Sequence, residues 1–134
     1  MFSEDRDRSR PAAVTAAGID HVRLWYHYLD TGDLDAYGSL LDENAQLSRP
    51  DAPPGHGREQ IMQRQAELAA YCAGHHIYKI IAADDAVAVM GSYTPSPAAA
   101  TARGRTGEIE FADFFTLTDR GLLLTCRRYY FVAP

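Results

Sequence analysis

Hydrophobic residues recur at every third or fourth position in the first quarter of the chain. One face of a helix would carry Ile19, Val22, Tyr26 and Leu29. This spacing predicts an amphipathic helix that begins near Val14. Gly32 follows the last hydrophobic position and is a residue that commonly ends helices, so the helix is expected to end there.

Two shorter helices are predicted next. Asp33 can accept backbone N–H groups at the start of a helix that runs to about Leu41. Another helix is predicted over residues 58–72, where one face would carry Ile61, Gln65, Leu68 and Cys72. Between these helices, residues 45–49 resemble a short strand. The following segment, PDAPPGHG at residues 50–57, is expected to be a loop because of its prolines and glycines.

The second half of the chain changes to the pattern of strands. β-branched and aromatic residues dominate residues 75–83, 87–94, 108–118 and 122–132. The D-R-G sequence at 119–121 predicts a tight hairpin, whereas residues 95–107 are low in complexity and are expected to form a mobile loop. Helices followed by antiparallel strands predict the α+β class.

Composition narrows the class of protein. The 134 residues suit one domain, in which residues 1–13 are expected to be a flexible tail and residues 14–134 the folded part. A net charge of −5 makes nucleic acid an improbable partner. No apolar run is long enough to span a membrane, and the charged start is unlike a signal peptide, so the cytoplasm is the expected location.

Three strings together resemble the nuclear-transport-factor-two-like superfamily, and its SnoaL-like branch in particular. They are TGDLDAYGSLLDENAQL at 31–47, HGREQI at 56–61 and DFFTLTDRGLLLTCRRYYF at 113–131. The resemblance implies a cone-shaped, curved mixed or antiparallel sheet wrapped around three N-terminal helices, as in cystatin-like α+β rolls. It also implies a cavity that opens at one end, and homodimers that pack through the sheet. This superfamily mixes enzymes, binding proteins and assembly modules.

Asp113 and Arg128 are the two charged residues that strand alternation turns inward. Asp113 shares its face of residues 109–117 with apolar side chains only, and Arg128 interrupts a similar row. The hairpin would place the two residues opposite each other or one diagonal apart. Asp113 is therefore a candidate acid or base and Arg128 a candidate partner in catalysis. The alternative is a buried pair that serves as a structural clamp or an anion-recognising site.

The resemblance places Asp113 where ketosteroid isomerases carry the acid that donates to the steroid oxygen. It places Arg49 at the position of their general base and Trp25 at that of their helix-one tyrosine. Epoxide hydrolases of this superfamily use an Asp-Arg-Asp set, for which this chain offers Phe111 and Arg128 at the last two positions. Neither mechanism therefore transfers intact.

Other polar and aromatic residues are candidates for binding a ligand. Arg49 and His56 would border the mouth of the pocket, although a role in the turn explains His56 better than a role in catalysis. The aromatic candidates, each of which could instead belong to the core, are Trp25, Tyr28, Tyr93, Phe111, Phe115 and Tyr130. His75 and His76 would point to opposite faces of a strand, so no metal site is expected. No cofactor motif is present.

The leading hypothesis is a pocket protein that binds a hydrophobic or aromatic small molecule. It would cyclise or isomerise a polyketide or aromatic metabolite of secondary metabolism by proton transfer, without a cofactor. Asp113 would act as acid or base, and Arg128 and Arg49 would stabilise an enolate or a carboxylate. One alternative is a non-catalytic protein that sequesters a reactive natural product. Another is a structural dimerisation module.

Overall fold

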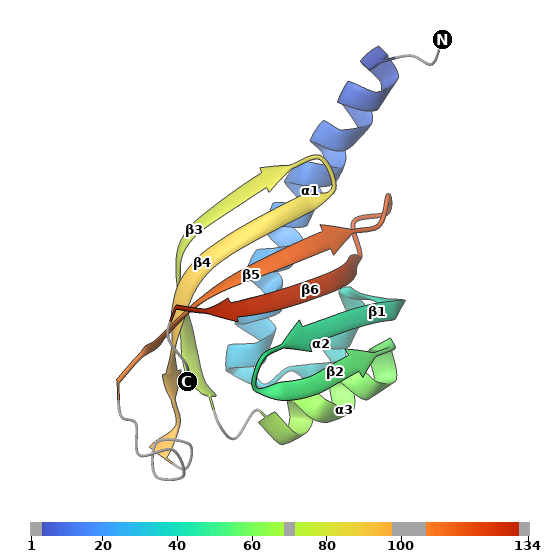
Figure 1. Cartoon of the computed structure of the whole chain (residues 1–134). Coiled ribbons are helices and arrows are strands. Elements are labelled where there is room, and N and C mark those ends of the chain that lie inside the picture. The colour runs from blue at the N-terminus through green and yellow to red at the C-terminus, as the bar shows by residue number, and fades with distance from the viewer. Residues whose placement is uncertain (1–3, 69–71, 98–106, 132–134) are drawn as a thin grey trace.

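A computed structural model describes residues 4–68, 72–97 and 107–131. It contains three helices and one six-stranded sheet with the strand order β2-β1-β6-β5-β4-β3 (Figure 1). The helices are α1 (Glu4–Thr31), α2 (Leu34–Ser39) and α3 (Arg58–Leu68). The strands are β1 (Leu41–Arg49), β2 (Ala52–His56), β3 (Cys72–Ala83), β4 (Ala86–Pro95), β5 (Ile109–Leu117) and β6 (Leu123–Tyr130). Only β1 and β6 pair in parallel, so the predicted mixed α+β sheet is confirmed.

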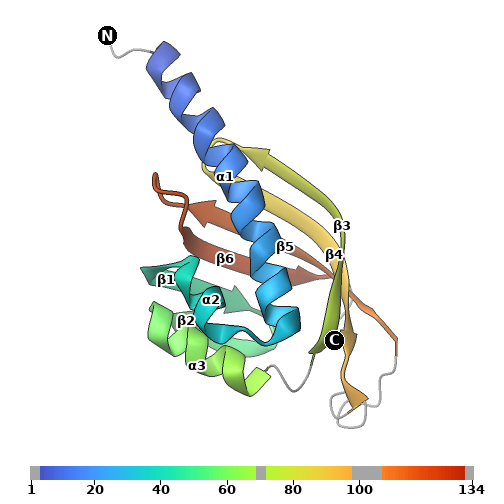
Figure 2. The same cartoon turned by 180° about the vertical axis from the view of Figure 1, so that it is seen from behind.

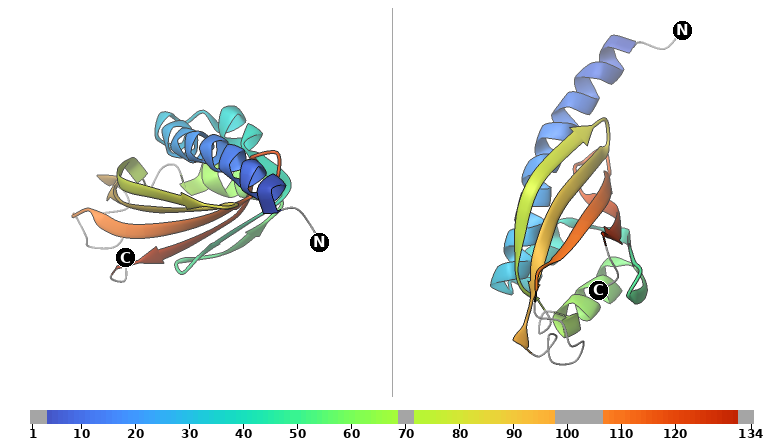
Figure 3. Two further views of the ribbon diagram at one scale, coloured as in Figure 1. Left: turned by 90° about the horizontal axis from the view of Figure 1, so that it is seen from above. Right: turned by 60° about the vertical axis from the view of Figure 1, so that its left-hand side comes forward.

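The sheet curves around α1, which crosses its inner face (Figures 2 and 3). The hydrophobic stripe of α1 explains this packing, because Val22, Trp25 and Tyr26 are all buried. They meet the inner residues of β4, β5 and β6 in one core, which includes Val89, Phe115, Leu123 and Cys126. The helix therefore closes the open side of the curved sheet.

The start of α1 differs from the sequence prediction. The helix begins at Glu4 instead of near Val14, so most of the segment predicted to be a tail is helical. This part of α1 projects beyond the sheet (Figure 1), where a helix needs no apolar stripe.

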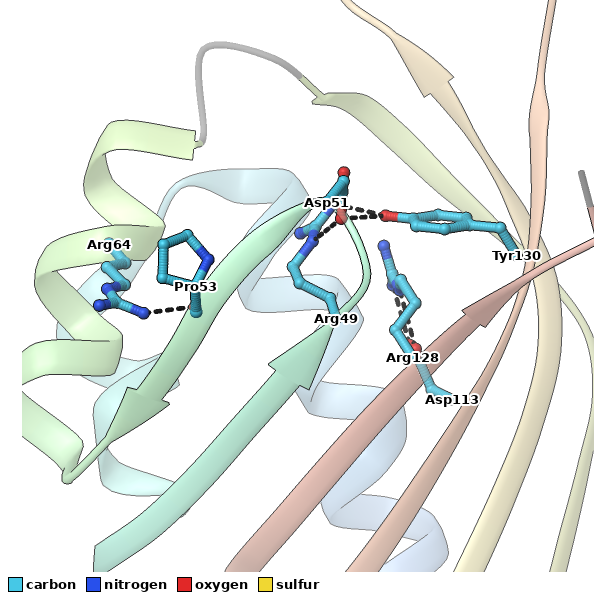
Figure 4. Close-up of polar contacts among 7 residues, drawn as sticks. All are labelled: Arg49, Asp51, Pro53, Arg64, Asp113, Arg128 and Tyr130. Atoms are coloured by element: carbon cyan, nitrogen blue, oxygen red, sulfur yellow. Dashed lines mark hydrogen bonds and ion pairs between the residues drawn. The ribbon is translucent and has the colours of Figure 1, made fainter. Parts of the chain in front are cut away.

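The proline-rich segment is the second difference. Residues 52–56 form β2, which pairs antiparallel with β1 at the edge of the sheet, although this segment was predicted to be a loop. An edge strand tolerates proline because the missing N–H faces no neighbouring strand. Nη1 of Arg64 in α3 donates a hydrogen bond to the carbonyl group of Pro53 at 2.5 Å (Figure 4). It also donates to the carbonyl group of Pro54 at 2.5 Å.

The bounds of several helices and strands also differ from the sequence prediction. α2 ends at Ser39 and β1 begins at Leu41, whereas a helix through about Leu41 and a strand from residue 45 were expected. α3 ends at Leu68, and Cys72 begins β3. Most of the predicted mobile loop, residues 98–106, lies outside the described residues.

The hairpin between β5 and β6 has the predicted form. Gly121 takes a positive φ of 82°, and its N–H bonds to the carbonyl of Thr118 at 2.9 Å. The resulting register sets Asp113 directly opposite Arg128. Alternate residues of β5 are buried, as the period of two requires, and Asp113 is one of them. The hairpin therefore fixes the relative position of the two inward charges.

The described helices include none that is long and apolar enough to cross a membrane. In the same part of the chain, no three His, Cys, Asp or Glu side chains are grouped as metal ligands would be. The cytoplasmic location stays a prediction.

Candidate functional site

Asp113 and Arg128 form a bidentate ion pair in the interior. Nε of Arg128 lies 2.8 Å from Oδ1 of Asp113, and Nη2 lies 2.8 Å from Oδ2 (Figure 4). The side chains are only 1% (Asp113) and 10% (Arg128) exposed. Burial alone would lower the pKa of Arg128, but the carboxylate of Asp113 outweighs it and raises that pKa. Arg128 therefore stays charged.

Tyr26 of α1 completes the hydrogen bonding of Asp113. Its hydroxyl donates to Oδ2 of Asp113 at 2.6 Å. Burial raises the pKa of Tyr26, and the negative charge of Asp113 raises it further. Asp113 thus accepts three hydrogen bonds, two of them from a cation. A carboxylate held in this way is an orienting group more than a proton carrier.

The guanidinium of Arg128 lies over two aromatic rings. Its central carbon is 4.1 Å from the centroid of Phe111 and 5.6 Å from that of Tyr93. Tyr130 extends this wall, with its ring 6.4 Å from Tyr93. In the part of the chain that the structure describes, Nη1 of Arg128 has no hydrogen-bond partner. The guanidinium is therefore held by one edge and has donors left at the other.

A second charged pair lies beside the outer end of Arg128. Arg49, at the end of β1, is paired with Asp51, with Nε 2.7 Å from Oδ1. Tyr130 joins them, because its hydroxyl accepts from Arg49 at 2.6 Å and donates to Asp51 at 3.1 Å (Figure 4). Burial would raise the pKa of Asp51, but the hydrogen bond from Arg49 lowers it. Two cations and a phenol thus converge at one end of the sheet.

Asp30 and His75 form a pair that sequence reasoning missed. Nδ1 of His75 lies 2.5 Å from Oδ1 of Asp30, and the backbone N–H of His75 donates to Oδ2 at 3.0 Å. The ring of His75 also packs near Tyr26, Tyr93 and Phe111. The only available signal was the stripe of α1, which puts Asp30 one turn beyond Tyr26 and facing the sheet.

Four predicted ligand-binding residues lie apart from this cluster or at its margin, namely Trp25, Tyr28, His56 and Phe115. Trp25 packs on Tyr37 and Phe115 in the core, at centroid distances of 4.6 and 5.3 Å. Tyr28 is partly buried beside His27. His56 is exposed on β2, where its N–H bonds Oε1 of Gln60. By contrast, Arg49, Tyr93, Phe111 and Tyr130 are brought together with Asp113 and Arg128.

A small hollow lies among the described residues of α1, α3, β1 and β6. About 170 Å³ of it is free of atoms, part of this volume is open to solvent, and there is no room for a water molecule. Its lining is almost wholly apolar and includes Trp25, Leu47, Ile61 and Cys126. Trp25 therefore packs against other core side chains in this region and does not line a space that could hold a ligand. The polar cluster of Arg128 and Tyr130 is not part of this hollow.

Comparison with known proteins identifies relatives by fold. The solved structures that resemble this chain include an NTF2-like protein of unknown function from Cytophaga hutchinsonii, with 18% identity, 84% of this chain and 88% of that chain covered, and a TM-score of 0.69. A candidate SnoaL-like polyketide cyclase from Jannaschia sp. CCS1 has 15% identity, 88% coverage of both chains and a TM-score of 0.72. An LEH-like epoxide hydrolase from M. tuberculosis has 16% identity, with 87% and 84% covered and a TM-score of 0.71.

At these identities the likeness establishes a shared fold and nothing about the reaction. No curated protein matches the chain. The sequence model of the SnoaL-like domain, however, matches residues 22–124, which span everything from the buried part of α1 to the start of β6. The chain therefore belongs to the SnoaL-like domain family, and it shares its fold with NTF2-like proteins.

Proposed function

We propose that this protein binds an organic small molecule. In the complex, the guanidinium of Arg128 would donate hydrogen bonds to an oxygen atom of the ligand. The observation that carries the proposal is the state of Arg128, which is nine-tenths buried, held by Asp113 at one edge and left with donors at Nη1. A fixed, desolvated cation with free N–H groups suits a carbonyl, enolate or carboxylate oxygen. The rings of Phe111, Tyr93 and Tyr130 would contact the aromatic or hydrophobic body of the ligand.

The reaction class that this arrangement favours is isomerisation or cyclisation by proton transfer, without a cofactor. Both reactions pass through an enolate, and a buried arginine stabilises the negative oxygen that develops. In this proposal Asp113 orients Arg128 and does not itself move a proton, because three hydrogen bonds occupy it. The shared fold with a candidate polyketide cyclase makes polyketide-like ketones the first substrates to test.

Binding without turnover is the second candidate function for the same site. This function is favoured because Asp113, the acid or base expected from the sequence, already accepts three hydrogen bonds. A sequestering protein would need the aromatic wall and Arg128 but no proton acceptor. Measurements of turnover on bound ketones separate the two candidates.

A binding titration tests the proposal. The probe is 2-naphthol, a fluorescent planar phenol whose anion resembles an aromatic enolate. The test variant is Asp113→Asn with Arg128→Gln, which removes both charges and leaves neither one buried alone. We expect it to weaken binding by about tenfold or more, because a charged hydrogen bond contributes about 1.5–3 kcal/mol.

Arg127→Gln is the matched control. Arg127 is the neighbouring residue of β6, but it is exposed and pairs with Phe114 on the outer side of the sheet. This control should bind 2-naphthol as the wild type does. Equal affinity in the double variant and the control, with both folded by circular dichroism, would contradict the role of Arg128.

We also propose that two copies pair through the outer face of the sheet. The support is an exposed group of large hydrophobic residues, Tyr78, Ile81, Met90, Phe114, Tyr129 and Phe131. Phe114 and Tyr129 come from adjacent strands and contact each other edge to face, with centroids 5.7 Å apart. α1 covers the opposite face, which leaves this one open to a partner (Figure 3). The resemblance noted from the sequence favours a second copy as that partner.

A further inference from the structure

We propose that the site recognises organic acids, and that Arg49 is the residue that binds the carboxylate of the ligand. This inference rests on the proposed function, because it adds a second subsite beside the oxygen atom that Arg128 would bind. It concerns recognition only, so it applies equally to a ligand that reacts and to one that is sequestered. The ligand class that it names is an aromatic hydroxy acid or a β-keto acid, in which the carboxylate is attached next to the phenol or ketone carbon.

Arg49 and Arg128 lie side by side on the inner face of the sheet. β1 and β6 pair in parallel, and Leu47 of β1 is opposite Cys126 of β6. Two residues further along, the same ladder brings Arg49 level with Arg128, and the period of two keeps both on the face of Leu47 and Cys126. Neighbouring strands are about 4.8 Å apart, so the two guanidinium groups are suited to adjacent parts of one ligand.

Tyr130 connects the two arginines. It follows Arg128 by two residues on β6, and its hydroxyl accepts a hydrogen bond from Nη2 of Arg49 at 2.6 Å. The guanidinium of Arg128 is directed toward the same hydroxyl (Figure 4). This hydroxyl donates its one proton to Asp51 at 3.1 Å, so it has none left for a ligand. Among the described residues of this cluster, the donors that remain for a ligand are those of the two arginines.

Each arginine is fixed by its own carboxylate and keeps donors at Nη1. Asp51 accepts from Nε and Nη2 of Arg49 at 2.7 and 3.0 Å, as Asp113 accepts from the same two atoms of Arg128. Nη1 of Arg49, like Nη1 of Arg128, has no hydrogen-bond partner in the described part of the chain. Because both side chains are already ordered, little rotamer freedom remains to be lost when a ligand binds.

Two adjacent positive charges favour an anion over a neutral group. Burial would lower the pKa of Arg49, and the positive charge of Arg128 acts in the same direction, but the hydrogen bond with Asp51 and the nearby Tyr130 outweigh them and raise that pKa. Arg49 therefore stays charged. A negative charge bound between the two guanidinium groups would relieve their repulsion, whereas a neutral amide or ester would gain hydrogen bonds without this relief.

The proposed carboxylate subsite is reached from solvent. The side chains of Arg49 and Asp51 are 17% and 16% exposed, whereas that of Arg128 is 10% exposed. A carboxylate is costly to desolvate, so the more exposed arginine suits it better. The more buried Arg128, which lies over the rings of Phe111 and Tyr93, suits the phenol or ketone oxygen next to the body of the ligand.

The test compares two ligands that differ in charge alone at the proposed subsite. 3-Hydroxy-2-naphthoate is 2-naphthol with a carboxylate on the adjoining carbon, and 3-hydroxy-2-naphthamide carries a neutral amide there. We expect the wild type to bind the acid about tenfold or more tightly than the amide, because hydrogen bonds to charged groups are the stronger ones. Fluorescence titrations at one pH and one ionic strength give both dissociation constants.

Arg49→Gln should lower the preference for the acid over the amide by about tenfold. Tyr130→Phe should lower it by a smaller factor, because Arg49 would keep Asp51 but lose the bond that holds it beside Arg128. Arg127→Gln is the matched control, since it removes the same charge from an exposed residue on the outer face of β6. The control should keep the wild-type preference. A ratio of two affinities does not change with a general loss of stability.

Three results would overturn the inference. They are equal binding of the acid and the amide by the wild type, an unchanged preference in folded Arg49→Gln, and an equal loss of preference in Arg127→Gln. In each case, binding of 2-naphthol that still depends on Arg128 would leave the proposed function intact. If Arg49→Gln does not fold, Tyr130→Phe decides, and an unchanged preference there overturns the inference. If the wild type binds neither 2-naphthol, the acid nor the amide, the proposed function is overturned and the inference with it.

Discussion

The hydroxyl of Tyr26 donates to Oδ2 of Asp113 at 2.6 Å and so ties α1 to the middle of the sheet. Asp113 is itself clamped by Arg128, which means that a helix, β5 and β6 share one buried hydrogen-bond network. The cone and the site are therefore stabilised by the same three side chains. Changes to any of them should alter stability as well as binding.

Tyr26→Phe should destabilise the protein. The variant keeps the buried ring but removes a hydrogen bond to a charged group, so the free energy of unfolding should fall by about 1.5–3 kcal/mol. Urea unfolding followed by fluorescence measures this change. Tyr28→Phe is the control, because Tyr28 is partly buried on the same helix and its hydroxyl has no described partner. An equal effect of the two substitutions would contradict the importance of the bond to Asp113.

Removing one charge of the Asp113–Arg128 pair should lower the free energy of unfolding more than removing both charges. Asp113→Asn leaves the guanidinium of Arg128 buried without its counter-ion, a change that typically destabilises by about 3–5 kcal/mol. Combination with Arg128→Gln should restore a large part of this loss, because no unpaired charge remains. A double-mutant cycle of unfolding free energies measures the coupling. Additive effects would show that the pair is not coupled.

Tyr37→Phe should leave the protein as stable as the wild type or make it more stable by about 1 kcal/mol. The ring of Tyr37 is fully buried, and its hydroxyl has no hydrogen-bond partner among the residues described. Burial raises the pKa of this phenol, so it stays neutral and simply lacks a partner. Deleting an unsatisfied polar atom removes its desolvation penalty. A marked fall in the thermal midpoint would reveal an ordered water or other partner at that hydroxyl.

The Asp30–His75 pair should make stability fall in acid. The folded-state pKa of Asp30 is below its unfolded value of about 3.9, so the stabilisation is fully present above that pH. It is lost as the pH falls through the lower folded-state pKa. Asp30→Asn should therefore flatten the dependence of the unfolding midpoint on pH between about 5 and 2. Asp35→Asn, on the exposed side of α2, is the charge-matched control and should retain the wild-type slope.

Phe114→Asp should weaken self-association. Phe114 is 49% exposed at the centre of the outer face, where a buried carboxylate would disfavour contact with a second copy. Sedimentation velocity over a range of concentrations should show a dimer for the wild type and a monomer for the variant. The inner face should be unaffected, so binding of 2-naphthol should persist. A monomeric wild type would refute the proposed pairing.

Much of the hairpin could be predicted from the sequence because its determinants are local. The period of two along β5 turns Asp113 inward, and the turn at Gly121 brings Arg128 opposite it or one diagonal away. The register of the ladder, which has an irregularity between Thr116 and Leu117, sets the two directly opposite. The first helix was likewise predicted from its stripe, but its beginning was not. The helix begins at Glu4, and no hydrophobic periodicity in the sequence marks that beginning.

What the sequence alone could not supply were contacts between distant segments. β2 is a strand because an edge of the sheet tolerates its prolines and because Arg64 donates hydrogen bonds to their carbonyl groups. Neither condition is visible in residues 50–57. Local pattern determined most of the elements, their inward faces and that Arg128 lies opposite Asp113 or one diagonal away. The structure places the two residues directly opposite each other. Only the tertiary structure decided that Tyr26 completes that pair and that Asp30 meets His75, 45 positions away. The physical reason is that a hydrogen bond depends on distances that the curvature of the whole sheet sets, whereas alternation and turns are fixed within a few residues.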